Sequence, residues 1–185
     1  MSASVFRIVL TSVLVLSFAS IGEAQMSREQ KIASATAAAP AEISAKATIV
    51  DWPAKPGAEM PLIRKGSNGW VCLPSQPPSK YIRNNAMCVD KPWQAWMAGL
   101  MAGKKPNIKE VGYGYMLTND SEESNAAFSD TVPTKTNQWH HVGAHVMVVY
   151  PNTKTAHAVS SDPHNGGPYV MYKGTPYAHV MVPLK

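Results

Sequence analysis

Apolar residues recur at the spacing of an α-helix in one long segment of the chain, DKPWQAWMAGLMAGKKP. The stripe consists of Trp93, Trp96, Met97, Leu100 and Met101. Asp90 can cap the start of this helix and Gly103 can end it. We expect the stripe to pack on a sheet as the main helical part of the core. A groove of aromatic and methionine side chains for a hydrophobic ligand is the alternative use of the same residues.

A second, weaker helix is predicted near the N-terminus, over residues 28–38. Ser27 and Gln30 stand in a capping-box arrangement, and good helix formers follow as far as Pro40. The apolar face of this helix is thin, because it consists mainly of Ile32 and alanines. We assign residues 25–45 to an N-terminal helical segment.

Runs of β-branched or alternating apolar residues predict the first strands. AKATIVDW, at 45–52, and NIKEVGYGYMLT, at 107–118, each predict one strand, and the second strand has one heavy face. PLIRKGSNGWVCLP, at 61–74, contains two short apolar runs around Gly66-Ser67-Asn68-Gly69. Because this tetrapeptide has turn chemistry, the segment predicts a hairpin.

The C-terminal third predicts a central strand and a second hairpin. HHVGAHVMVVYP, at 140–151, predicts a strand that is apolar on both faces from Val146 to Tyr150, as central strands are. The arms of the hairpin are expected at 169–172 and 177–182, with the turn at Gly174-Thr175. Residues 46–185 are therefore expected to form one α+β domain. Its sheet should be mainly antiparallel, with five or six strands and the Trp-rich amphipathic helix packed on one face.

One polar stretch, residues 119–137, has no periodicity. A loop of this length is either functional or mobile, and its single large apolar residue is Phe128. Because no set of ligands converges there in the sequence, mobility is the favoured interpretation.

The first 24 residues are typical of a secretory signal peptide. Arg7 precedes an apolar run from Ile8 to about Ile21, and the small-x-small triplet Gly22-Glu23-Ala24 follows. We expect cleavage before Gln25, a periplasmic or secreted protein, and no membrane span after cleavage. An uncleaved anchor is the alternative, but the run is short for a bilayer span of about 20 residues.

Charge argues against nucleic acid as a partner. The net charge is +5, and it is unchanged by cleavage because Arg7 and Glu23 remove one charge of each sign. Lysines and arginines are scattered, and only Lys104 and Lys105 are adjacent. A basic run interleaved with aromatic residues, which nucleic-acid binding favours, is missing. The mature chain of about 160 residues suits a single domain, and its oligomeric state is left open.

The two cysteines, Cys72 and Cys88, predict a disulfide. An exported chain meets an oxidising compartment, and this pair can be joined across a loop stiffened by prolines. A thiol metal or redox site is the competing interpretation, but the sequence has no Cys-x-x-Cys.

A repeated HVMV motif raises the question of a metal site. Residues i and i+2 share one face of a strand, so His145 lies beside Met147, and His179 beside Met181. If the two strands pair, these four side chains could bind Cu(I), which suits imidazole and thioether ligands. The favoured interpretation is that these side chains are ordinary core residues and that the protein has no cofactor. Copper is the alternative.

Catalytic motifs are weak. Ser160, Ser161, Asp162 and His164 are close in sequence, but such adjacency in a turn usually serves turn chemistry. No residue is assigned a catalytic role, and a small hydrolase-like enzyme without a motif is kept as an alternative. Four residues are candidates for a ligand or partner surface: Trp93, Trp96, Trp139 and His164.

Several motifs across the mature chain resemble a family of small, exported, hypothetical bacterial proteins. They include GWVCLP, MCVDKPW and NGGPYVMYKGTPYAHVMVP. The resemblance implies export and a single domain, and it brings no activity, cofactor or catalytic residue. We therefore expect an exported binding or structural module of the bacterial cell envelope. Its partner would be an envelope component, recognised by a flat apolar patch, or a small molecule held in an enclosed pocket.

Overall fold

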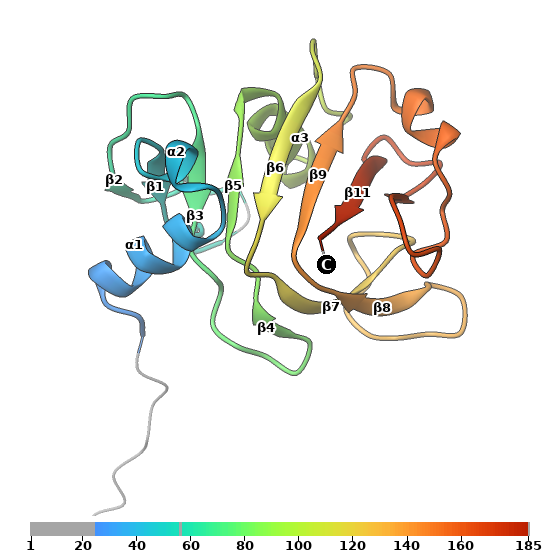
Figure 1. Cartoon of the computed structure of the whole chain (residues 1–185), viewed down its shortest axis with the longest axis horizontal. Coiled ribbons are helices and arrows are strands. Elements are labelled where there is room, and N and C mark those ends of the chain that lie inside the picture. The colour runs from blue at the N-terminus through green and yellow to red at the C-terminus, as the bar shows by residue number, and fades with distance from the viewer. Residues whose placement is uncertain (1–24, 56, 185) are drawn as a thin grey trace, which may run out of the picture.

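Eight strands form one large mixed sheet, and three form a small antiparallel sheet below it in the view of Figure 1. The computed structural model describes residues 25–55 and 57–184, so the leader expected at 1–24 lies outside the described residues. The large sheet has the order β10 (Tyr169–Met171), β11 (His179–Pro183), β9 (His145–Val149), β6 (Gly112–Met116), β5 (Met87–Val89), β3 (Val71–Leu73), β1 (Thr48–Val50) and β2 (Leu62–Arg64). The small sheet has the order β4 (Ile82–Asn84), β7 (Asp120–Ser124) and β8 (Trp139–Val142).

The predicted α+β class is confirmed, but the prediction of five or six strands is wrong. Among the strand pairs that the structure describes, β1 and β3 run parallel and the others run antiparallel, so the large sheet is mixed. The additional strands β4, β5 and β7 are three to five residues long. Strands this short show little alternation, and their pairing depends on neighbours distant in sequence.

The Trp-rich helix is confirmed as α3 (Lys91–Met101), and it packs on β6 and β9. Asp90 caps it by accepting the backbone N–H of Trp93 at 3.0 Å. The other carboxylate oxygen accepts the N–H of Tyr113 at 2.6 Å. One side chain therefore satisfies the helix start and fixes it against β6.

Two glycines of β6 let α3 approach the sheet closely. A Cβ added at Gly112 would lie 2.5 Å from the Cβ of Pro92, and one at Gly114 would lie 2.8 Å from the Cε of Met147. The rigid proline leaves no room for a side chain at Gly112, so this position requires glycine, whereas a side chain at Gly114 would displace the end of Met147. The glycine side of β6 therefore faces α3, and the heavy side with Tyr113 and Tyr115 faces the other way.

The opposite face of the sheet, at its β1–β3–β5 end, is covered by α1 (Arg28–Ala37) and α2 (Ala41–Ser44) (Figure 1). The predicted capping box at Ser27 is present. Cys72 of β3 lies directly opposite Cys88 of β5, and the two are joined, so the predicted disulfide is confirmed. Both cysteines are fully buried against α1. The bond thus links two paired strands beneath the N-terminal helix.

The predicted hairpin at 61–74 is wrong, because β1 lies between its two arms. The backbone N–H of Ser67 donates to the carbonyl of Lys46, and that of Thr48 donates to the carbonyl of Trp70. The connection therefore passes over β1 instead of turning tightly. Gly66 allows this crossing, since a Cβ there would lie 2.2 Å from the backbone of Ala47.

Two other segments also differ from their predictions. The strand expected at 140–151 is broken at Gly143 and Ala144, so that β8 belongs to the small sheet and β9 to the large one. As expected, β9 is central, between β6 and β11. The loop expected at 119–137 begins with β7, the middle strand of the small sheet. The C-terminal hairpin of β10 and β11 is confirmed.

Candidate functional site

The face of the large sheet opposite α3 is open over its central strands. α1 and α2 cover one end of this face, and the 3-10 helix η1 (Thr153–Ala158) packs over β10 and β11 at the other end (Figure 1). Between them Tyr113 is 47% exposed, Val111 41% and Leu184 43%. We call this surface the open face.

Cross-strand pairing makes the open face continuous. Tyr113 lies opposite Val148, while Tyr115 and Val182 both lie opposite Val146. Tyr115, Val146, Val148 and Val182 are half-buried, and none of them carries a charge. The open face is therefore an uncharged apolar strip. Tyr115 borders the cluster under α1, and Val148 and Val182 border the cluster under η1. Exposed apolar surface of this kind is typical of interaction sites.

A groove lies on the other side of the sheet, between α3 and strands β1 and β3. Its volume is about 520 Å³, and its lining is almost entirely apolar. Principal lining residues are Val50, Met60, Val71, Leu73, Met97 and Met101. The predicted apolar stripe of α3 is thus divided, since Trp93 and Trp96 enter the core while Met97 and Met101 border the groove.

The two predicted His-x-Met pairs lie on the neighbouring strands β9 and β11, and all four side chains are buried on the α3 face. Met147 and Met181 are directly opposite each other. His145 lies opposite Pro183, which is four residues beyond His179. At about 3.3 Å per residue the backbone positions of the two histidines are therefore separated by roughly 13 Å along the strands. The register places the two methionines opposite each other and the two histidines at different levels of the sheet.

His179 is enclosed by aromatic rings. Its ring centroid lies 5.3 Å from those of Trp93, Trp96 and Tyr172, in edge-on arrangements. Nδ1 lies 3.0 Å from the carbonyl oxygen of Tyr177. Burial lowers the pKa of His179 to about 4, so the imidazole is neutral near pH 7.

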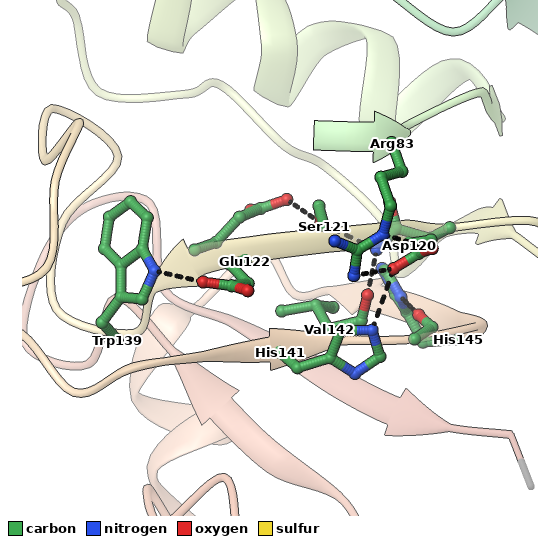
Figure 2. A network of polar contacts seen from close by, with 11 residues as sticks. Arg83, Asp120, Ser121, Glu122, Trp139, His141, Val142 and His145 are labelled. Carbon is green, nitrogen blue, oxygen red and sulfur yellow. Dashed lines mark hydrogen bonds and ion pairs between the residues drawn. The ribbon is translucent and has the colours of Figure 1, made fainter. Parts of the chain in front are cut away.

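The small sheet presents a polar network on its outer face, shown in Figure 2. Arg83 of β4 donates to both carboxylate oxygens of Asp120 of β7, at 2.7 and 2.8 Å. His141 of β8 lies 3.1 Å from the same carboxylate. The hydrogen bonds from Arg83 and, to a smaller extent, from His141 lower the pKa of Asp120 to about 2. Beside them the indole N–H of Trp139 donates to Glu122 at 3.3 Å.

The inner face of the small sheet carries a largely buried polar cluster. Ser121 donates to Glu123 at 2.6 Å, and burial raises the pKa of Glu123. Glu123 lies opposite His140, whose Nε2 is 3.0 Å from the Tyr169 hydroxyl of β10. Burial lowers the pKa of His140 and raises that of Tyr169. These contacts connect the small sheet to the edge of the large one.

The structure separates the four residues predicted for a ligand or partner surface. Trp93 and Trp96 are 2% and 5% exposed, because they pack against β9 and β11 beneath α3, so they are not part of a surface. Trp139 is half-buried and meets Tyr81 edge-on at 4.9 Å. His164 is exposed, with its ring 6.0 Å from that of His140.

The serine-rich turn before β10 serves turn chemistry, as expected. The Ser160 hydroxyl accepts the N–H of Asp162, and the Asp162 carboxylate accepts the N–H of His164. These are local side-chain-to-backbone bonds of the kind that stabilise turns. The hydrogen bonds described for this turn do not assemble a nucleophile, base and acid.

Sequence reasoning missed Arg83, Asp120, Glu123 and Tyr169. Asp120 and Glu123 belong to the polar stretch interpreted as mobile, and Arg83 belongs to the proline-rich segment. The sequence DSEES is compatible with a strand. Only the pairing of β7 with β4 and β8 shows that Asp120 lies on the outer face of the small sheet and Glu123 on its inner face. The sequence signal for the open face was the set of large side chains, Tyr113 and Tyr115 among them, on one side of the strand predicted at 107–118.

Two further properties concern metals and membranes. In the described part of the chain, no three His, Cys, Asp or Glu side chains are grouped as a metal site would need. No helix within 25–55 or 57–184 has the length and apolar character required to cross a bilayer.

No protein-family model matches the chain, and no significantly similar curated protein or solved structure was found.

Proposed function

We propose that the protein is an exported binding module of the bacterial cell envelope that docks on a partner protein through the open face. The observation that carries this proposal is the continuous, uncharged and partly exposed surface of β6, β9 and β11 around Tyr113. A flat apolar patch fits a macromolecular partner, whereas a small molecule requires enclosure.

The composition of the open face fits a protein interface. The cores of such interfaces are depleted in charge and enriched in aromatic residues, tyrosine among them. Tyr113 and Tyr115 stand on the same side of β6, with Val146 and Val148 beside them on β9. An apolar partner surface would remove these side chains from water, and their hydroxyls could hydrogen-bond at the rim.

Export rests on the leader pattern of residues 1–24 and on the family resemblance, and the disulfide supports it. Disulfides persist in oxidising compartments and are rare in the bacterial cytoplasm. The bond between Cys72 and Cys88 fixes the β3–β5 pair beneath α1. The open face would then lie on a rigid sheet, which keeps the entropic cost of docking low.

Replacing Tyr113 by Glu tests the proposal. Introducing a charge at the centre of an apolar interface should weaken co-sedimentation with the envelope fraction of the producing bacterium at least tenfold, because interface aromatics contribute about 2 kcal/mol or more. Leu62→Glu is the matched control, since Leu62 is 64% exposed on the edge strand β2, away from the open face.

Both variants should unfold close to the wild-type temperature, because Tyr113 is about half exposed and Leu62 is 64% exposed in the isolated protein. Equal co-sedimentation of wild type and Tyr113→Glu would contradict the proposal. The alternative is that a second copy of this chain covers the open face. Size-exclusion chromatography of the wild type tests it, because such a contact would give a dimer.

A further inference from the structure

Soft ligands form a contiguous row on the α3 face of the large sheet. Met116 of β6 lies directly opposite His145 of β9. Met147 follows His145 by two residues and therefore points to the same face. Side chains directly opposite in an antiparallel pair have Cβ atoms roughly 5 Å apart, within reach of a shared ion for methionine and histidine.

His145 has a buried nitrogen without a partner. The residue is 3% exposed, and its Nδ1 lies 2.7 Å from the carbonyl oxygen of Gly143. A carbonyl only accepts, so Nδ1 carries the proton and Nε2 carries the lone pair. Nε2 is buried and has no hydrogen-bond partner among the described residues. A buried acceptor left unpaired is costly, and a bound group at Nε2 would remove that cost.

The arrangement around His145 is that of a metal ligand. Histidines that bind metals usually donate their other N–H to a carbonyl or carboxylate, which fixes the ring and the tautomer. The bond to Gly143 performs this role for His145.

We propose that His145 Nε2, with the thioether sulfurs of Met116 and Met147, forms a binding site for a soft monovalent cation of the Cu(I) class. Imidazole and thioether ligands select such cations over Mg²⁺ and Ca²⁺, which require oxygen. The site is independent of the open face, because Gly112, Gly114 and the buried residues of β9 face α3 instead. It retains His145 and Met147 from the predicted set and adds Met116. It leaves out His179 and also Met181, which lies opposite Met147, whereas the β11 residue opposite His145 is Pro183.

Two features of the chain favour a soft cation over zinc. The structure groups no three His, Cys, Asp or Glu side chains in its described ranges, so the usual zinc ligands do not converge. Both cysteines are in the disulfide, so thiolates do not compete with the thioethers.

Silver(I) titration of the oxidised mature protein tests the site, because Ag(I) has the ligand preference of Cu(I) and does not change oxidation state in the experiment. Isothermal titration measures stoichiometry and affinity, and the methionine methyl signals in carbon-13 NMR locate the ion. We expect one Ag(I) per chain, with the methyl signals of Met116 and Met147 shifting most.

Met116→Leu and Met147→Leu should each weaken Ag(I) binding at least tenfold, since leucine keeps the apolar volume and removes the sulfur. Met97→Leu, which changes a methionine of the α3 groove, should leave the affinity unchanged. The proposal is overturned if the wild type does not bind Ag(I), if other methionine signals shift instead, or if both variants keep the wild-type affinity. Should a variant fail to fold, the methyl shifts of the wild type decide alone.

Discussion

Replacing Cys72 and Cys88 together by alanine should lower the free energy of unfolding by about 3 kcal/mol. Closing a loop of this size constrains the unfolded chain by about that amount, and removal of a native disulfide typically costs about 2 to 5 kcal/mol. Alanine is the suitable replacement because both cysteines are fully buried in an apolar cluster that includes Ala35, Ala38 and Ala47, and alanine adds no polar group to it. Urea denaturation followed by circular dichroism measures the change.

Reduction of the wild type provides the matched control. A thiol reductant should shift the wild-type midpoint toward that of the double variant and leave the variant unchanged, because only the wild type has a bond to lose. A double variant with the wild-type midpoint would show that the bond between β3 and β5 does not stabilise the fold.

Truncating Trp96 to alanine should destabilise the protein by about 3 to 5 kcal/mol, the range for large aromatic residues removed from a packed core. Trp96 lies 4.6 Å from Trp93, 5.3 Å from His179 and 6.1 Å from Tyr177, measured between ring centroids. Its removal would open a cavity between α3 and β11 that these rings cannot fill without leaving their positions.

Met97→Ala is the comparison for this prediction, since Met97 is on the same helix but borders the groove and is only half-buried. It should cost clearly less than Trp96→Ala in the same denaturation experiment. Similar small losses for both would mean that the aromatic half of the stripe is not the core contact between α3 and the sheet.

The elements with strong local signals could be predicted from the sequence. The capping box at Ser27, the cap at Asp90 and the periodic stripe of α3 act within a few residues, so α1 and α3 are recognisable without tertiary information. The turn between β10 and β11 is local in the same way. The disulfide followed from two cysteines and the expected compartment.

Strand order could not be predicted, because it depends on contacts between distant segments. β1 separates β2 from β3, and only the backbone bonds around Gly66 show that the connection crosses it. β7 has the sequence DSEES, whose polar side chains become ordered only by pairing with β4 and β8. Local patterns contain no information on either arrangement.

The candidate sites show the same limit. The sequence indicated that Tyr113 and Tyr115 share one face of a strand, but the contact of α3 with Gly112 and Gly114 decides that this face points away from the helix. His145 and Met147 were recognisable as neighbours at i and i+2. Met116 was not, since its position opposite His145 depends on the register of β6 and β9.

The most direct measurement for the open face is photo-crosslinking from position 113 in the living bacterium. A photoreactive amino acid would replace Tyr113, and a second strain would carry it at Leu62 on the edge strand β2. If the open face docks on an envelope protein, irradiation should yield one discrete crosslinked species from position 113 and not from position 62. The absence of a crosslink from position 113, or the same products from both positions, would contradict the proposed function.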